Sequence, residues 1–151
     1  MPDTDTPPFR RAVIALNGGP SDERIVHLVV ELATKGAELI AVHVVEIDWT
    51  LPLDADIAGR SEEVQRVLDT AEAVAEAHKM VLEPVLLQAR DVAAAIVDEA
   101  TERAADLLVV GLPYRKRFGG EFDIGRTVPY ILQNAPCAVW VVREPMSEEA
   151  S

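Results

Sequence analysis

The sequence predicts a single α/β domain in which helices cover both faces of a doubly wound, five-stranded parallel sheet. Short apolar segments alternate with segments of helical periodicity along nearly the whole chain, as expected for buried parallel strands joined by helices. A length of 151 residues fits one domain, and 49% hydrophobic with 26% charged residues is typical of a globular protein. We find no internal repeat and no linker that would divide the chain.

The first third of the chain predicts two strands and the helix between them. An apolar run at 12–16 predicts the first strand, and Ser21 is the expected N-cap of a helix that continues to about Lys35. A second apolar run, 39–45, predicts the next strand. Residues 46–60 then show no period, and a connection of that length is often functional or mobile.

The middle of the chain repeats the alternation. Ser61 begins an amphipathic helix, and 84–87 predicts the third strand. Pro84 restricts that segment to a strand start or a sheet edge, because proline has no N–H to donate. Asp91 is the expected N-cap of a third helix, which leads to a fourth strand at 107–110.

The last predicted elements are a short helix at 127–133, ended by Pro136, and a fifth strand at 138–142. We expect residues 1–10 to be a flexible N-terminus and 144–151 a flexible acidic tail, because both segments are mostly polar. The domain would then occupy 11–143.

The overall charge excludes some classes of partner. A formal net charge of -12 and a pI near 4.6 argue against broad binding to nucleic acid or to anionic membranes. The single cysteine, Cys137, cannot form an intramolecular disulfide, which fits a reducing cytoplasm. The N-terminus lacks the pattern of a secretory signal, and no apolar run approaches the roughly 18–20 residues that cross a bilayer. We therefore expect a cytoplasmic protein without membrane insertion.

Positive charge is concentrated in the glycine-containing loop at 111–126. Four of the 14 basic residues lie there: Arg115, Lys116, Arg117 and Arg126. Glycines let backbone N–H groups approach a ligand, and the following helix contributes a positive N-terminus, so the loop favours an anion such as a nucleotide phosphate. Ligands in such sheets bind beyond the carboxyl ends of the strands, where 17–21 and 46–60 also lie. The alternative is that 115–117 is an ordinary solvated loop tip.

The sequence offers little for catalysis. Residues 120–127 (GEFDIGRT) are one substitution from a P-loop, but they follow their strand too late, and Glu121 and Asp123 would repel phosphate. No serine, cysteine or lysine nucleophile lies in a recognisable triad or elbow. We therefore name no catalytic residue and expect at most slow ATP hydrolysis.

A resident metal site is not predicted either. No cysteine or carboxylate stands at metal-ligand spacing from His27 or His78. The carboxylates around the long loop either help to hold Mg²⁺ beside a nucleotide or are simply solvated; they are Glu46, Asp48, Asp54 and Asp56.

The predicted last strand is apolar on both faces. Ala138, Trp140 and Val142 point to one side, and the residues between them point to the other. An edge strand of this kind invites pairing with a second chain, so we expect a homodimer through this strand. Simple burial under helices is the alternative.

Several segments between 11 and 143 resemble the universal stress protein family. The resemblance rests on VIALNGG at the end of the first strand, AVHVV in the second, ADLLVVG before the basic loop, and NAPCAVWVV at the close. It implies a five-stranded fold with strand order 3-2-1-4-5, usually dimeric, and binding of ATP or AMP in many members.

Members that bind nucleotide resemble one another in a loop of the form Gly, two residues, Gly, nine residues, Gly, then Ser or Thr. Gly111 matches the first glycine, Tyr114 replaces the second, and Gly125 matches the third after one extra residue. Arg126 replaces the hydroxyl residue, and Thr127 follows it.

The same resemblance assigns roles at the nucleotide. Asn17 stands where binding members have an aspartate, and with Val44 it would contact ribose and adenine. The residues that would hold the phosphates are Gly111, Gly125, Arg126 and Thr127, with Arg115 and Arg117 as side-chain substitutes for backbone contacts.

Two functions remain from the sequence. The first is a stress-response module that binds ATP or AMP, with Mg²⁺, as a signal. The second is a nucleotide-free dimeric interaction module that regulates a partner such as a transporter. The variant loop, which lacks the second glycine, is similar to that of stress-protein domains found alongside amino-acid transporters.

Overall fold

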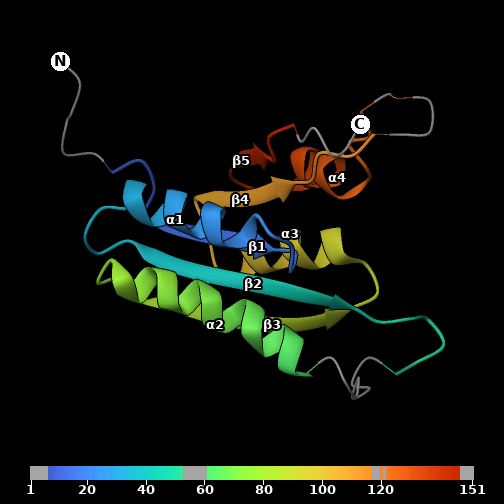
Figure 1. The fold of residues 1–151 in the computed structure, drawn as a ribbon, viewed down its shortest axis with the longest axis horizontal. Helices are drawn as coiled ribbons and strands as arrows, with labels where there is room; N and C mark the ends of the chain where they lie inside the picture. Colours follow the sequence, from blue (N-terminus) through green and yellow to red (C-terminus); the bar gives the residue numbers. More distant parts are fainter. Residues whose placement is uncertain (1–6, 53–60, 117–119, 121, 147–151) are drawn as a thin grey trace.

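Five parallel strands form one sheet in the order β3-β2-β1-β4-β5, as the computed structural model shows for residues 7–52, 61–116, 120 and 122–146 (Figure 1). The elements follow one another as β1 (Arg11–Leu16), α1 (Asp22–Leu32), β2 (Glu38–Glu46), α2 (Ser61–Ala77), β3 (Leu82–Ala89), α3 (Val92–Glu102), β4 (Leu107–Leu112), α4 (Thr127–Asn134) and β5 (Ala138–Arg143). The predicted fold class and strand order are confirmed.

The helices lie in two layers on opposite faces of the sheet (Figure 1). Alternate residues of β1 pack against the two helix layers. Ile14 packs with α1 and α2, whereas Val13 packs with α3 and α4. Both side chains are fully buried. The continuous apolar character of the central strands therefore follows from burial on both faces. Among the described residues, no helix is long and apolar enough to cross a membrane.

The sheet has its edges at β3 and β5. Pro84 lies within β3, opposite Ala41 of β2, and an edge strand tolerates the missing N–H. At the other edge, β5 pairs with β4 from Leu107–Ala138 to Leu112–Arg143. The edge position expected for Pro84 is confirmed.

Several predicted boundaries are wrong. β3 spans Leu82–Ala89 rather than 84–87. α1 ends at Leu32 rather than at Lys35, because Ala33 already has an extended backbone. β4 continues to Leu112 rather than ending at 110, because its pairing with β5 continues and Leu112 O accepts a hydrogen bond from Glu144 N at 2.9 Å.

The segment before β1 packs onto the sheet. Phe9 is 2% exposed and contacts Trp140 edge to face, with ring centroids 5.7 Å apart. Arg10 N donates to Asp106 Oδ2 at 2.8 Å. We expected all of 1–10 to be flexible, and this expectation is wrong for the last residues of that segment. Of the expected flexible ends, residues 1–6 and 147–151 lie outside the described part.

Candidate functional site

A cavity of about 360 Å³ opens at the carboxyl ends of the strands, beside the start of α4. Its volume is within the range of roughly 300–1,000 Å³ typical of small-molecule sites. Seven of the eight residues predicted for the site line it: Asn17, Val44, Gly111, Arg115, Gly125, Arg126 and Thr127. The eighth, Arg117, lies outside the described residues.

The inner wall of the cavity is apolar. The side chains of β2, α3 and β4 that form it are Val44, Val92, Ile96 and Val110. Val128 of α4 also lines the cavity and is 3% exposed. Of these residues, sequence reasoning selected only Val44. The periodicity of the other apolar residues predicts core positions, and it does not distinguish the core from a cavity wall.

The N-terminus of α4 faces the cavity without a capping side chain. Arg126 occupies the N-cap position, and its side chain makes no capping hydrogen bond. Pro129 has no N–H, so Thr127 and Val128 supply the backbone donors of the first turn, which α4 itself does not use. Gly125 precedes them with a φ of +73° and donates to Asp123 Oδ1 at 3.1 Å. This end of the helix combines backbone donors with an exposed guanidinium.

The loop before α1 is closed by its own side chains. The Asp22 carboxylate accepts hydrogen bonds from Asn17 N at 3.1 Å and Gly18 N at 2.8 Å. Asn17 Oδ1 accepts from Gly19 N at 2.7 Å. Burial raises the pKa of Asp22, and the two backbone hydrogen bonds oppose that shift. Ser21 occupies the N-cap position of α1, as expected, but its side chain makes no capping hydrogen bond.

Gly111 borders the cavity within β4 and has a second reason to lack a side chain. A Cβ at this position would lie 2.7 Å from Ile25 Cδ1, well inside van der Waals contact. Ile25 is 1% exposed in the core between α1 and the sheet. Gly111 therefore permits the close packing of α1 on β4, independently of any ligand.

The basic loop leaves the sheet as a hairpin. Asp123 N donates to Arg115 O at 2.8 Å, and Lys116 pairs with Phe122 in an antiparallel bridge. The Tyr114 ring stacks on Phe122 with centroids 5.4 Å apart and an interplanar angle of 19°. The guanidinium carbon of Arg143 in β5 lies 5.0 Å from the Tyr114 ring centroid. Tyr114 at the base of this hairpin is thus held by ring contacts with Phe122 and Arg143.

The carboxylates near the long loop separate into different environments. Glu46 lines the cavity. Asp48 Oδ1 accepts hydrogen bonds from both the N–H and the hydroxyl of Thr50 at 2.8 Å, which lowers the pKa of Asp48. Asp54 and Asp56 lie outside the described residues. Within the described residues, no group of three histidine, cysteine or acidic side chains is placed to hold a metal ion.

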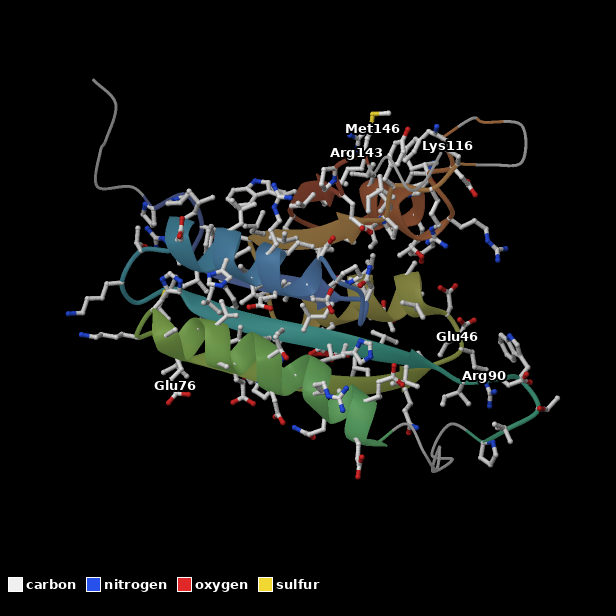
Figure 2. All side chains as sticks on the ribbon, in the orientation of Figure 1. Glu46, Glu76, Arg90, Lys116, Arg143 and Met146 are labelled. Carbon is white, nitrogen blue, oxygen red and sulfur yellow. The ribbon has the colours of Figure 1, made fainter. Side chains whose placement is uncertain are left out.

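Sequence reasoning missed two residues beside the cavity, Trp49 and Arg90. The Arg90 guanidinium lies 5.1 Å from the Trp49 ring centroid, and Arg90 Nη1 donates to Asp48 O at 2.8 Å. Figure 2 shows Arg90 and Glu46 at the same end of the sheet. The only sequence signal was a tryptophan in a connection without periodicity.

Comparison with known proteins identifies relatives over nearly the whole chain. The profile of the universal stress protein family matches residues 8–143. The chain is 32% identical over 142 residues to the sensor protein KdpD of Mycobacterium tuberculosis, covering 93% of this chain but 15% of that relative.

Solved structures of low sequence identity share the fold. A universal stress protein from Archaeoglobus fulgidus in complex with dAMP is 21% identical, with a TM-score of 0.67 over 87% of this chain and 96% of that one. A universal stress protein family protein from Arabidopsis thaliana with AMP bound is 15% identical, with a TM-score of 0.62 over 91% and 94%.

Proposed function

The chain belongs to the universal stress protein family, and on that premise we propose that it is a regulatory module that binds an adenine nucleotide beyond the carboxyl ends of its strands. The observation that carries this proposal is one cavity with an apolar wall and a basic, uncapped helix N-terminus. The apolar wall suits a planar base, and the helix N-terminus suits a phosphate. Relatives of the same fold that hold AMP and dAMP support the proposal.

Each end of the nucleotide has its own residues in this proposal. Val44 and the neighbouring apolar wall contact the adenine, and Asn17 contacts the ribose. The start of α4, beside Gly125, holds the phosphate through the backbone N–H groups of Thr127 and Val128 and through the Arg126 guanidinium. Arg115, held at the cavity by the hairpin, adds a second positive charge.

Mg²⁺ would arrive with the phosphates of ATP rather than at a site of its own. Magnesium commonly binds through one or two carboxylates together with substrate phosphates. Among the described residues, Glu46 and Asp123 are the carboxylates that line the cavity, and Glu46 fits this role better because Asp123 Oδ1 already accepts a hydrogen bond from Gly125 N. Mg²⁺ would bring charge compensation for the phosphates.

Calorimetric titration of nucleotide-stripped protein with AMP and with Mg-ATP tests the proposal. We expect micromolar binding. Arg126→Ala should weaken it by about 1.5–3 kcal/mol, the scale of a hydrogen bond to a charged group. The matched control is Lys35→Ala, which removes an exposed positive charge near the other end of the sheet. Absence of heat up to millimolar nucleotide would contradict the proposal.

We also propose that the module acts as a homodimer through β5, in a reducing, cytoplasmic setting. β5 is an edge strand, Trp140 and Val142 are only partly buried, and Val141 is 38% exposed. Unpaired strand edges with apolar faces favour pairing with another strand. Light scattering after size exclusion should give twice the chain mass, and Val141→Lys should return it to one chain. A single-chain mass for the unmodified protein would contradict this.

The alternative role, regulation of a protein partner without a nucleotide, has one observation in its favour. The matched relative is a sensor protein, and this chain corresponds to 15% of its length. A domain of this kind therefore occurs as part of a larger signalling protein. Co-purification of a transporter or kinase with nucleotide-free protein would favour this role over nucleotide sensing.

A further inference from the structure

A second cavity, of about 580 Å³, adjoins the first one. The two cavities share four lining residues: Glu46, Val92, Arg126 and Thr127. The second cavity is also lined by Trp49, which follows β2, by Arg90, which follows β3, and by Tyr130 of α4. A ligand whose phosphate lies against Arg126 can therefore reach either cavity, because Arg126 borders both.

Trp49 is held in an exposed position by an ordered turn. Ile47, two residues earlier, is 1% exposed, and its N–H donates to Ala89 O at 2.8 Å. The Asp48 carboxylate fixes Thr50 on the other side. The Trp49 side chain itself is 79% exposed. Large aromatic side chains often anchor ligands and partners. Trp49 is available for this role because it is not packed in the core.

The chemistry around Trp49 selects a planar, partly polar group. Arg90 occupies one position over the indole and is itself fixed by its hydrogen bond to Asp48 O. An exposed indole offers a surface on which a nucleobase stacks, and such stacking tolerates any base. The carboxylates of Glu46 and Asp91 border the same cavity and accept hydrogen bonds from ribose hydroxyls or base amino groups.

We propose that the two cavities together bind a phosphate-bridged dinucleotide. One adenosine occupies the first cavity, the bridging phosphates lie at Arg126 and the start of α4, and the second base stacks on Trp49. The inference rests on the proposed nucleotide site for its first half. Its second half depends on Trp49 and Arg90, which the proposed mononucleotide site does not use.

The test compares diadenosine triphosphate with ATP by calorimetry on the stripped full chain. The two ligands carry the same number of phosphates and differ in the second adenosine. We expect diadenosine triphosphate to bind about tenfold more tightly, within the range measured for stacking of one base on an aromatic side chain. Trp49→Ala should bring the ratio of the two affinities to about one, and Trp49→Phe should keep most of the preference.

Val81→Ala is the matched control, because Val81 is 88% exposed and borders neither of the two cavities. It should keep the full preference. Equal affinity for the two ligands in the unmodified protein would overturn the inference and leave the proposed function standing. Binding of diadenosine triphosphate alone, abolished in Trp49→Ala, would support the inference and remove the mononucleotide proposal. Binding of neither would overturn both.

Discussion

Two loops at the same edge of the sheet, one before α1 and one before α4, use their backbone donors in opposite ways. Before α1, the buried Asp22 carboxylate takes the N–H groups of Asn17 and Gly18. Before α4, the N-cap residue is an exposed arginine without a capping bond. Because an internal carboxylate competes with a bound anion, we expect the phosphate of the proposed nucleotide at α4 rather than at the backbone N–H groups of the α1 loop.

The start of α3 supports the same comparison. Asp91 accepts a hydrogen bond from Ala94 N at 3.1 Å, which is the usual N-cap arrangement. Asp123 also lies near α4, but its Oδ1 bonds Gly125 N, ahead of the helix. Among these three helix starts, only that of α4 has a positively charged residue at the N-cap.

The largest expected effect comes from giving α4 the carboxylate that the other loops have. Arg126→Asp replaces a positive charge at the cavity by a negative one at the N-cap. Removing a charged hydrogen bond costs about 1.5–3 kcal/mol, and added repulsion should bring the loss of nucleotide affinity to about a hundredfold or more. Thermal unfolding should show no loss of stability, since aspartate is a favourable N-cap residue. Retained affinity would contradict the assignment of the phosphate to α4.

Removal of the carboxylate from the α1 loop should act on stability instead. Asp22→Ala leaves two backbone N–H groups without their acceptor, at a cost of about 2–3 kcal/mol in the free energy of unfolding. Asp22→Asn keeps one acceptor oxygen and should cost less. Urea denaturation of both variants measures this, and a large loss of nucleotide affinity in properly folded Asp22→Asn would break the comparison.

The contribution of Asp22 to stability changes with pH in a defined direction. Burial raises its folded-state pKa above the ordinary value of 3.8, so the folded protein binds the proton more tightly than the unfolded chain. The Asp22 contribution to stability therefore falls as pH rises from 3.8 through the raised pKa. Asp22→Asn, which does not titrate, should gain stability relative to the unmodified protein over that window. A loss of stability of Asp22→Asn relative to the unmodified protein over that pH window would mean that the hydrogen bonds affect the pKa of Asp22 more than burial does.

A variant at Gly111 tests the packing role of this residue, with a smaller expected effect on stability. Gly111→Ala places a Cβ 2.7 Å from Ile25 Cδ1, and overpacking of this kind costs about 1–3 kcal/mol. Ile25→Val removes the clashing methyl group, so the double variant should recover most of that loss. Denaturation of the two single variants and the double variant measures the coupling. Additive losses would mean that Gly111 is required for another reason.

The smallest expected effect is at α3. Asp91→Ala removes an N-cap hydrogen bond and should lower the free energy of unfolding by about 1 kcal/mol. Asp91→Asn, which keeps the acceptor, should lose less. Chemical denaturation measures both changes, and equal losses would show that the charge of Asp91 matters more than its hydrogen bond.

The fold could be predicted because its signals are local. Apolar runs and helical periods gave all nine elements, and most boundaries were near those observed. Ser21 is the N-cap of α1, as predicted, but the side chain that bonds the preceding loop is that of Asp22, the next residue. Their difference lies in burial and in the bonds from Asn17 and Gly18, which local pattern does not encode.

The candidate site was only partly predictable. The family resemblance and the concentration of charge selected the residues that line one cavity. Contacts between residues far apart in the sequence were not predictable. The examples are the cation–π contacts of Arg90 with Trp49 and of Arg143 with Tyr114. Each pair depends on strand register, which brings the ends of β2 and β3, and of β4 and β5, side by side.

The comparison of the two loops is tested most directly by backbone amide NMR during titration with inorganic phosphate. We expect the amide signals of Thr127 and Val128 to shift most and those of Asn17 and Gly18, already bonded to Asp22, to shift far less. Largest phosphate-induced shifts at Asn17 and Gly18, with Thr127 and Val128 unchanged, would contradict this expectation.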